Sequence, residues 1–333
     1  MKAILAGAGI AGFLHSLAYR AHGVPIAGIY DPDAQRARDL ATLCGGSVVA
    51  SLDELADLDA DIASICSPPA VHADQAERLA RCGRAVLIEK PVAVSISELE
   101  RLRALPRCIP VVQWRAGRAI RAVRRAIACG ELGDAPVVSC DLAWARDDAY
   151  VKTRDASWGC GAVLSIGIHA IDALEWAVDR EVEDVSGFTT RREGAWAETG
   201  AVGLVRFVGG AMASVRISLD GGADATRLTF CGRGMTAVIE GREGDPTGTS
   251  VRWIAARGSG AHARVASLEA LERETSGALG SPLLVPYIGD AIAALREGRA
   301  PGESDRLLSI ADSFAAHTTA MALGRGEGAK RRR

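Results

Sequence analysis

The sequence predicts an α/β protein with an N-terminal doubly wound parallel sheet and a C-terminal α/β domain built on a large, mainly antiparallel open sheet. Two observations predict this architecture. Short apolar runs alternate with amphipathic helical patterns through the first third of the 333 residues, which is typical of parallel sheets covered on both faces. After about residue 120, most strand patterns are separated by glycine-rich turns, as in antiparallel sheets. We therefore expect two domains, at residues 1–120 and 121–333.

The N-terminal strands are predicted from short apolar runs, because strands buried on both faces have no polar side to alternate with. The runs are Ala3 to Ala6, Ile26 to Tyr30, Ser47 to Ala50, Ile62 to Cys66, Ala85 to Ile88 and Pro110 to Gln113. Helices are predicted between them at Ile10 to His22, Ala34 to Cys44, Val71 to Cys82 and Ser97 to Leu105. Ligands of such sheets bind beyond the carboxyl ends of the strands.

A glycine fingerprint, G-A-G-I-A-G, follows the first strand and opens the first helix. In this context Gly7 permits a tight turn, Gly9 lets the backbone approach a pyrophosphate, and Gly12 lets the helix lie close to the strand. The N–H groups and the positive dipole end of the helix N-terminus suit phosphate groups. The sequence thus predicts a Rossmann dinucleotide-binding turn, in which Ile10 and Ala11 also contact the cofactor.

Asp31 ends the second strand, 19 positions after Gly12, where a Rossmann unit places its ribose-binding acid. Its carboxylate accepts hydrogen bonds from both hydroxyls of a free ribose and repels a 2′-phosphate. Arg36 lies one helical turn further on and would soften that repulsion, unless it is simply a solvated helix residue. The sequence therefore favours NAD as the cofactor, and NADP stays open.

A Glu-Lys-Pro element, Glu89-Lys90-Pro91, ends a later buried strand. Lysine is rare in this chain, at four of 39 basic residues, and unlike arginine it can take up and release a proton near neutral pH. Ser67 and Pro68 follow another strand and are expected at the same edge of the sheet as Asp31. These three segments converge on one crevice, where a cofactor and a substrate would meet.

Composition excludes several classes of protein. A net charge of −2 with 24% charged residues argues against binding to nucleic acid or to an anionic membrane. The eight cysteines form no C-x-x-C pair, so we expect reduced thiols and neither a disulfide framework nor a metal site. No apolar run approaches the roughly 18 residues of a spanning helix, and the first residues already form a strand rather than a signal peptide. We expect a cytoplasmic protein.

The C-terminal half begins with a predicted helix at Ala119 to Cys129 and ends with two more at Tyr287 to Arg296 and Asp305 to Leu323. Alternating or apolar patterns between them predict the strands of the second sheet. The predicted strands are Val137 to Ala145, Val182 to Thr190, Val202 to Phe207, Ala211 to Leu219, Arg227 to Cys231, Thr236 to Glu240 and Val251 to Ile254.

A helical pattern at residues 158–172 carries the most informative polar residues of this half. Ser165, His169 and Asp172 are four and three residues apart, so one face of a helix presents all three. An imidazole in a polar stripe beside an apolar stripe suits a helix that lines a cleft. The alternative for His169 is a hydrogen-bonded histidine in the core.

Together these motifs resemble the glucose–fructose oxidoreductase / inositol dehydrogenase / rhizopine catabolism (Gfo/Idh/MocA) family of NAD(P)-dependent oxidoreductases. The resemblance covers essentially the whole chain and is carried by the glycine turn, Asp31, Ser67-Pro68-Pro69 with His72, Glu89-Lys90-Pro91, and a pattern G-G-x-x-x-D-x-G-x-H-x-x-D that ends at Asp172. The chain does not match the family pattern at every position, and two of the departures bear on the site. Pro69 stands where members commonly have Asn, and Ser165 stands where they have the Asp that precedes the histidine.

The resemblance implies a role for each of these positions. Lys90 and His169 would be the catalytic residues beside the nicotinamide. Cofactor contacts would extend to Ser67, Pro68, His72 and Glu89. Substrate contacts would come from Ser165, Arg154, Lys152, Tyr150, Asp172 and Arg115. The residues of the 150–154 segment could equally form a solvated loop, Asp172 could support its helix, and Arg115 could form an ion pair at the turn between domains.

By resemblance, the protein is expected to be an NAD-dependent dehydrogenase that oxidises a secondary ring hydroxyl, or reduces the corresponding ketone, of a sugar, aminosugar or aminoglycoside, nucleotide sugar or cyclitol. One face of the open sheet would pack against another subunit, which gives a homodimer or a homotetramer. Two alternatives remain open: a sugar-modifying enzyme that returns the hydride without net NADH, and a non-catalytic dinucleotide-binding regulator.

Overall fold

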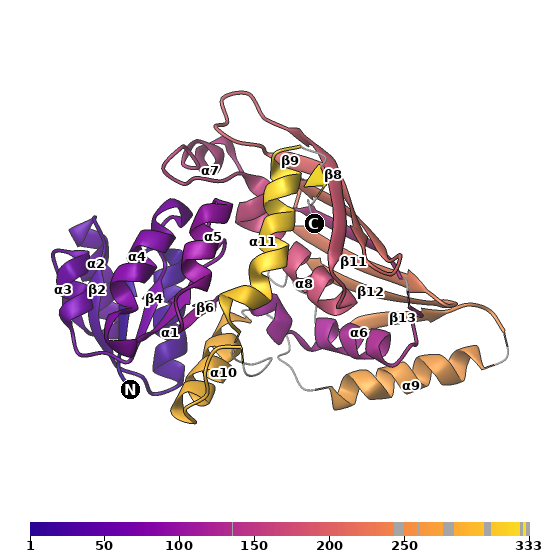
Figure 1. Ribbon diagram of the computed structural model, residues 1–333, viewed down its shortest axis with the longest axis horizontal. Helices are drawn as coiled ribbons and strands as arrows, with labels where there is room; N and C mark the ends of the chain where they lie inside the picture. Colours follow the sequence, from indigo (N-terminus) through magenta and orange to yellow (C-terminus); the bar gives the residue numbers. More distant parts are fainter. Residues whose placement is uncertain are drawn as a thin grey trace. The chain divides into compact units, whose positions relative to one another are not determined.

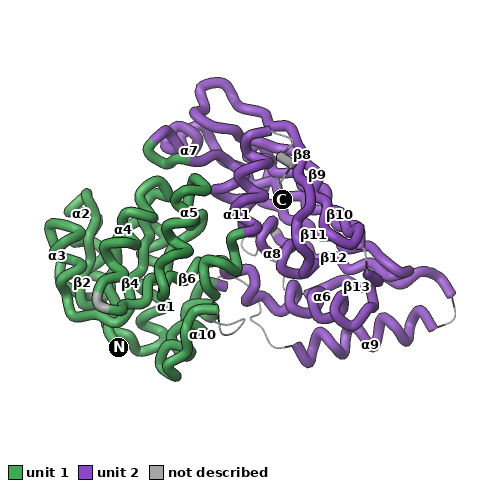
Figure 2. The backbone as a smooth tube through the Cα atoms, in the orientation of Figure 1, with its two compact units in different colours: residues 1–112, 157–159, 284–314 green, residues 113–156, 160–283, 315–333 purple. Residues whose placement is uncertain are grey.

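The computed structural model forms two compact units (Figure 2), each of which is described here by itself. Unit 1 comprises residues 1–112, 157–159 and 284–314, and unit 2 comprises residues 113–156, 160–283 and 315–333. The structure describes residues 1–134, 136–242, 250–258, 260–275, 283–302, 308–326 and 329–330.

Unit 1 is built on a six-stranded parallel sheet in the order β3-β2-β1-β4-β5-β6, of which β2, β4 and β6 are labelled in Figure 1. Its strands are β1 (Ala3–Ala6), β2 (Ile26–Tyr30), β3 (Ser47–Val48), β4 (Ile62–Ile65), β5 (Ala85–Ile88) and β6 (Cys108–Pro110). Every residue of β1, β4 and β5 is buried, as the apolar runs predict for strands covered on both faces. The predicted doubly wound parallel sheet is confirmed.

The helices of unit 1 alternate with these strands. They are α1 (Ile10–Ala21), α2 (Ala34–Cys44), α3 (Leu52–Asp57), α4 (His72–Leu79) and α5 (Ile96–Arg103). A later helix, α10 (Leu284–Arg296), packs on α1. The ring of His22 occupies the place where a side chain at Gly289 would lie, because an added Cβ would come within 2.3 Å of its Nε2. A segment far along the chain thus completes unit 1. The predicted division into a cofactor-binding domain and a substrate-binding domain at residue 120 remains a prediction.

Unit 2 is built on an eight-stranded sheet in the order β13-β12-β11-β7-β10-β9-β8-β14. Its strands are β7 (Val137–Ala143), β8 (Val182–Thr190), β9 (Gly200–Phe207), β10 (Met212–Ser218), β11 (Ala225–Gly232), β12 (Met235–Arg242), β13 (Val251–Ala255) and β14 (Ala329–Lys330). β7 and β10 run parallel, and every other neighbouring pair is antiparallel. The prediction of a second, mainly antiparallel sheet is confirmed.

Side chains alternate along the strands of the second sheet. In β10, Ala213, Val215 and Ile217 are buried while the residues between them are exposed, which is the pattern of a sheet with one covered face. The helices α6 (Arg118–Ala128) and α8 (Ile168–Val178) pack on each other and on these strands (Figure 1). The described part of unit 2 therefore has one face buried under helices and one face open.

Several elements differ from the prediction. The helices α3, α7 (Asp148–Lys152) and α9 (Ala261–Glu274) were not predicted. The strand expected at Pro110 to Gln113 lies two residues earlier, because Gln113 already begins a 3₁₀ turn. The last helix, α11, runs from Ile310 to Gly324, and the start predicted for it at Asp305 lies outside the described residues. Within the described ranges, no helix is both long enough and apolar enough to cross a bilayer.

Candidate functional site

The turn between β1 and α1 has the backbone form that a dinucleotide requires. Gly7 has φ +103°, and a Cβ there would lie 2.6 Å from the backbone of Cys66. A Cβ on Gly12 would lie 2.1 Å from a backbone oxygen of the same turn. Both positions therefore require glycine. A Cβ on Gly9 would meet no atom within 4 Å, so the side on which the pyrophosphate is expected is open.

The N-terminus of α1 is also available to a ligand. No side chain among the described residues caps it, and the side chain of Ile10 in its first turn is 82% exposed. Helix N-termini attract anions through their N–H groups and their dipole. The glycine turn and the uncapped helix end together fit the diphosphate of NAD, with Gly9, Ile10, Ala11 and Gly12 as the residues that would hold it.

Asp31 lies beside this turn. Its Oδ2 accepts the N–H of Ala8 at 2.8 Å, and its Oδ1 accepts the N–H of Asp33 at 2.9 Å. The carboxylate is thereby fixed at the rim of the glycine turn, where the ribose of a bound dinucleotide is expected. Arg36 instead pairs with Asp33, through Nε at 3.3 Å from Oδ2. The prediction that Asp31 selects NAD stays consistent with this geometry.

The structure brings the predicted strand-end segments of unit 1 together at one edge of the parallel sheet. The N–H of Gly7 donates to Tyr30, that of Cys66 to Ala6 at 2.7 Å, and that of Glu89 to Ile65 at 3.0 Å. These bonds join the carboxyl ends of neighbouring strands from β2 to β5. The glycine turn, Asp31, the Ser67 loop and the Glu-Lys-Pro element accordingly share this edge.

A buried chain of hydrogen bonds supports the Glu-Lys-Pro element. The Oε2 atom of Glu89 accepts the N–H of Lys90 at 3.1 Å, and its Oε1 atom lies 3.1 Å from Nε2 of His15. The other nitrogen of His15 lies 2.7 Å from Oγ of Ser64, which lies 2.6 Å from the hydroxyl of Tyr19. Each of His15, Ser64 and Tyr19 is fully buried. The chain ties the helix of the glycine turn to the strand end that carries Lys90.

These hydrogen bonds also affect the charge of Glu89. Burial disfavours the carboxylate, but the hydrogen bond from His15 and the attraction of Lys90 outweigh burial and lower the pKa of Glu89 below its usual value. A charged Glu89 is an acceptor for both the His15 ring and the Lys90 backbone. The sequence analysis missed His15, Ser64 and Tyr19. The one available signal was a histidine three residues after the last glycine of the fingerprint.

His72 lies between the Ser67 loop and the Glu-Lys-Pro element. It is fully buried, with Nδ1 2.9 Å from the carbonyl oxygen of Pro91 and Nε2 2.9 Å from that of Ser67. Burial lowers the pKa of His72, and a neutral imidazole donates to one of the two carbonyls at a time. The ring holds two loops together, while its contact with the cofactor stays a prediction.

The helix that carries His169 is not a regular α-helix. Val163–Gly167 form a π-helical turn, and the α-helix α8 begins at Ile168. The prediction of one continuous α-helical face through Ser165 is therefore wrong, because a π turn adds a residue and rotates what precedes it. Ser165, His169 and Asp172 are all buried. Each of them has different neighbours.

Two tryptophans flank the imidazole of His169. The ring of Trp114 stacks on it with centroids 5.4 Å apart and planes 10° apart, and Trp144 lies 6.3 Å away with a tilt of 39°. Beside Trp114, Arg115 forms a bidentate ion pair with Asp172, at 2.7 Å from Nε to Oδ2 and 2.6 Å from Nη2 to Oδ1. The short segment Gln113–Ala116 thus contacts α8 at both His169 and Asp172.

These contacts bear on the predicted roles. For Arg115 and Asp172 the structure shows the ion pair that the sequence analysis weighed against substrate contact, with side chains that are 6% and 0% exposed. Substrate contact by either residue stays a prediction. Trp114 and Trp144 were not among the predicted site residues, because a tryptophan in the sequence does not reveal which ring it stacks on.

Three predicted substrate residues of unit 2 meet at one small cavity. Tyr150, Arg154 and Ser165 line it, together with Glu198. The guanidinium of Arg154 lies over the ring of Tyr150 at 4.2 Å. Glu198 accepts the N–H of Val163 at 3.1 Å through Oε1, and burial raises the pKa of its carboxyl. Glu198 was not among the predicted site residues, and it lines the same cavity as Ser165.

Other predicted residues lie apart from this cavity. Lys152 is an exposed residue near the end of α7 and does not line it. Lys90 belongs to unit 1, and His169 belongs to unit 2. Among the described residues, no group of three His, Cys, Asp or Glu side chains is arranged to hold a metal ion.

Comparison with protein families decides what these features belong to. Residues 1–108 match the profile described as "Oxidoreductase family, NAD-binding Rossmann fold", and residues 120–244 match the "GFO/IDH/MocA C-terminal domain". The chain belongs to the Gfo/Idh/MocA family. The predicted family is thereby confirmed, as are the oxidoreductase class and NAD as the cofactor of the Rossmann domain.

Two of the curated relatives of this Gfo/Idh/MocA protein are named for an inositol and for an anhydro sugar. The chain is 32% identical over 197 residues to inositol 2-dehydrogenase of Rhizobium meliloti (strain 1021), which covers 55% of the chain and 56% of that enzyme. It is 28% identical over 252 residues to 1,5-anhydro-D-fructose reductase of Ensifer adhaerens, and this match covers 70% of the chain and 71% of that enzyme. The chain spans only about half the length of several of the curated relatives that it matches.

Solved structures of the family share the fold. The WlbA dehydrogenase of Bordetella pertussis, solved in complex with NADH and UDP-GlcNAcA, superposes with a TM-score of 0.81 over 98% of this chain and 95% of WlbA. The two sequences are 21% identical. This likeness establishes that the Gfo/Idh/MocA protein has the architecture of these dehydrogenases.

Proposed function

We propose that the protein is an NAD-dependent dehydrogenase that oxidises a secondary ring hydroxyl of a sugar-like substrate, or reduces the corresponding ketone. The substrate class comprises sugars, aminosugars or aminoglycosides, nucleotide sugars and cyclitols. The observation that carries the proposal is the position of Lys90, which follows β5 at the ligand-binding edge of an NAD-binding sheet and whose backbone is held by the buried carboxylate of Glu89.

The chemistry assigns a task to each group. NAD, when bound, accepts the hydride that leaves the carbon bearing the hydroxyl. The hydroxyl proton must leave at the same time, so a base has to contact that oxygen. In the proposal the Lys90 amine hydrogen-bonds the hydroxyl oxygen, and His169 contacts the same oxygen and passes the proton to solvent. The Trp114 ring stacked on His169 fixes the plane of the imidazole.

Substrate recognition is assigned to unit 2. Ser165, Tyr150 and Arg154 line one cavity, so the proposal uses them to hold hydroxyl groups of the ring. The ion pair of Arg115 with Asp172 keeps α8, and with it His169, in place. Lys152 is exposed on α7, and its contact with the substrate stays a prediction.

The proposal is tested by incubating the protein and NAD with a panel of monosaccharides, aminosugars, nucleotide sugars and inositols while NADH absorbance is recorded. We expect turnover with at least one of these classes. Lys90→Met, which keeps the length of the side chain and removes its amine, should lower kcat by at least about 100-fold. Full turnover by Lys90→Met would show that the assigned role of this lysine is wrong.

We further propose that the open face of the second sheet joins copies of the chain into a homodimer or homotetramer. Phe188, Val202 and Leu204 are 84%, 57% and 62% exposed on β8 and β9, and apolar side chains gathered on an open face favour association. Light scattering of Leu204→Glu should show smaller assemblies than the wild type. Leu43→Glu, at a leucine 61% exposed on α2, is the matched control. If the wild type, Leu204→Glu and Leu43→Glu form assemblies of equal mass, the proposal that this face joins subunits is wrong.

A further inference from the structure

Unit 2 contains a second, larger cavity of about 690 Å³ that opens to solvent. The residues that line it and matter here are Arg146, Asp147, Tyr150, Arg192, Leu219 and Asp220. Tyr150 and Leu219 also line the small cavity beside Ser165, so the two cavities adjoin within this unit. A volume of this size falls in the range of about 300–1,000 Å³ that is typical of sites for small-molecule ligands.

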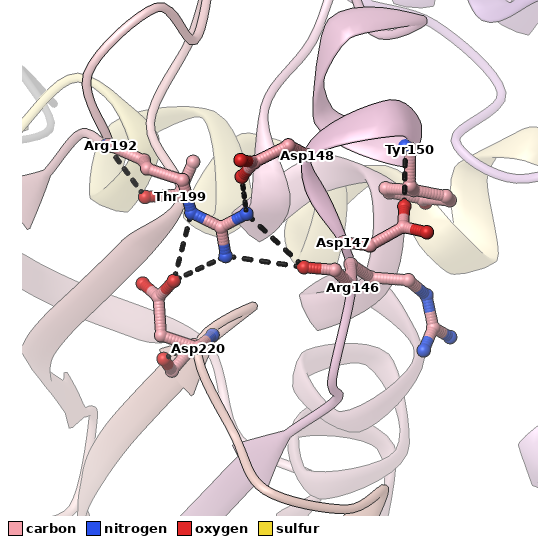
Figure 3. Close-up of polar contacts among 8 residues, drawn as sticks. Arg146, Asp147, Asp148, Tyr150, Arg192, Thr199 and Asp220 are labelled. Carbon is pink, nitrogen blue, oxygen red and sulfur yellow. Dashed lines mark hydrogen bonds and ion pairs between the residues drawn. The ribbon is translucent and has the colours of Figure 1, made fainter.

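Arg192 holds the walls of this cavity in place (Figure 3). Its Nε and Nη2 groups donate to Asp220, its Nη1 donates to Asp148 at 2.9 Å, and both Nη groups donate to the carbonyl oxygen of Arg146 at 3.2 Å. A guanidinium has five N–H groups, and these contacts use all five. Arg192 therefore joins the segments that follow β7, β8 and β10. The cavity is preformed, which lowers the cost of ordering its walls when a ligand binds.

Arg146 offers donors to a ligand in this cavity. Its guanidinium lies over the rings of Trp144 and Tyr150, with the carbon 5.3 Å and 5.4 Å from their centroids. Its Nη1 group donates to Asp224 at 3.0 Å and to the carbonyl oxygen of Ala145 at 2.6 Å. In the part of the chain that the structure describes, Nε and Nη2 of Arg146 have no protein acceptor. These N–H groups remain for a ligand.

Two carboxylates offer acceptors in the same cavity. Asp147 uses Oδ1 to cap α7, where it accepts the N–H of Tyr150 at 2.7 Å. Asp220 uses Oδ1 for Arg192. The second oxygen of each carboxylate accepts no hydrogen bond from the described residues. The cavity thus combines an aromatic ring, planar donors and carboxylate acceptors.

This combination of groups selects among ligand classes. A hydroxyl group donates one hydrogen bond and accepts two, so neighbouring hydroxyls of a sugar ring can use the Arg146 donors and the carboxylate acceptors together. An anionic group would lie beside the carboxylates of Asp147 and Asp220, and like charges in contact oppose binding. An apolar group would leave these polar atoms without hydrogen bonds.

We propose that this cavity binds the second sugar ring of a glycoside whose first ring is oxidised, and that this second ring carries no negative charge. The proposal rests on the proposed dehydrogenase function and narrows its substrate class from single sugars to glycosides. One hydroxyl of the oxidised ring enters the small cavity of about 20 Å³ beside Ser165, and the second ring lies past Tyr150, along the wall that the two cavities share.

The test measures kcat/KM in the presence of NAD for three monosaccharides: glucose, galactose and glucosamine. These values are compared with kcat/KM for maltose, lactose and the glucosamine disaccharide, and for glucose 1-phosphate. At least one disaccharide should exceed its monosaccharide by about tenfold or more, and the sugar phosphate should show no such gain. Arg146→Met should lower the ratio of disaccharide to monosaccharide by about tenfold, and Arg146→Lys should retain part of it. Arg180→Met, at an exposed arginine whose Nη1 donates to a backbone carbonyl, is the matched control and should keep the ratio.

Two results would overturn the proposal: disaccharides that are no better than their monosaccharides, or an unchanged ratio in a folded Arg146→Met protein. Circular dichroism confirms that the variant is folded. If no carbohydrate is oxidised at all, the dehydrogenase function fails, and ligand-observed NMR with the same disaccharides then decides the cavity assignment. Binding that weakens in Arg146→Met supports the assignment, and the absence of binding rejects it.

Discussion

Replacement of Asp172 by asparagine tests the ion pair that anchors helix α8. The carboxylate of Asp172 receives two N–H groups of Arg115 at 2.7 Å and 2.6 Å, and the two side chains are 0% and 6% exposed. Asparagine keeps the size of the side chain but removes the charge that balances the buried guanidinium. Loss of one partner of a buried pair typically costs about 3–5 kcal/mol. We expect Asp172→Asn to lower the free energy of unfolding by about that amount.

Urea unfolding followed by circular dichroism measures the change. Asp53→Asn is the matched control, because Asp53 pairs with Arg78 on the surface and the two side chains are 66% and 48% exposed. A surface pair contributes about 0–1 kcal/mol, so the control should differ little from the wild type. An Asp172→Asn protein no less stable than Asp53→Asn would show that the buried ion pair does not stabilise the fold.

A double variant separates the charge from the packing. Arg115→Met with Asp172→Leu replaces the buried pair by apolar side chains of similar size, and such replacements are often neutral or stabilising. The double variant should therefore be more stable than Asp172→Asn alone. A further loss in the double variant would mean that the site depends on polar contacts rather than on charge balance.

Three further predictions follow from unit 1. Gly12→Ala should destabilise the fold and abolish NAD binding in calorimetry, because its Cβ would lie 2.1 Å from a backbone oxygen. The Cβ of Gly9→Ala would meet no protein atom, so this variant should weaken NAD binding and leave the stability of the fold unchanged. Asp31→Ser should narrow the preference for NAD over NADP by at least about tenfold in competitive binding, because a like-charge contact with the 2′-phosphate is removed. The pKa of Glu89 lies below its usual value of 4.5 in the folded protein, so its contribution to stability is present above about pH 4.5 and is lost as the pH falls through the folded-state pKa. His15→Leu should raise the pKa of Glu89 and remove this contribution, which chemical unfolding measured between about pH 3 and pH 7 detects.

The fold of unit 1 could be predicted because its local signals agree. Apolar runs such as Ala85 to Ile88 are fully buried strands, and the glycines of the first turn occupy positions that a Cβ would fill. In unit 2, the strand predicted at Ala211 to Leu219 corresponds to β10, whose side chains alternate between buried and exposed. These features depend on residues close together in the sequence, which is why the sequence reveals them.

The missed features depend on residues far apart in the sequence. The stacking of Trp114 on His169 joins positions 55 apart, and the bond from His15 to Glu89 joins positions 74 apart. Helix α3 has six residues, which is too short for a helical period to stand out. The π turn at Val163–Gly167 packs closely on the second sheet, because a Cβ on Gly167 would lie 2.3 Å from the side chain of Ile217 on β10. Ile217 is 50 positions away in the sequence.

The proposed hydride transfer from a sugar ring carbon to NAD, beside Lys90, can be followed with an isotope. The best substrate of the panel carries deuterium on the reacting carbon, and mass spectrometry of the cofactor follows a single turnover. We expect reduced cofactor that is heavier by one deuterium, formed at least about 100-fold more slowly with Lys90→Met. Turnover of the labelled substrate with the deuterium lost to water, and none in the cofactor, would contradict it.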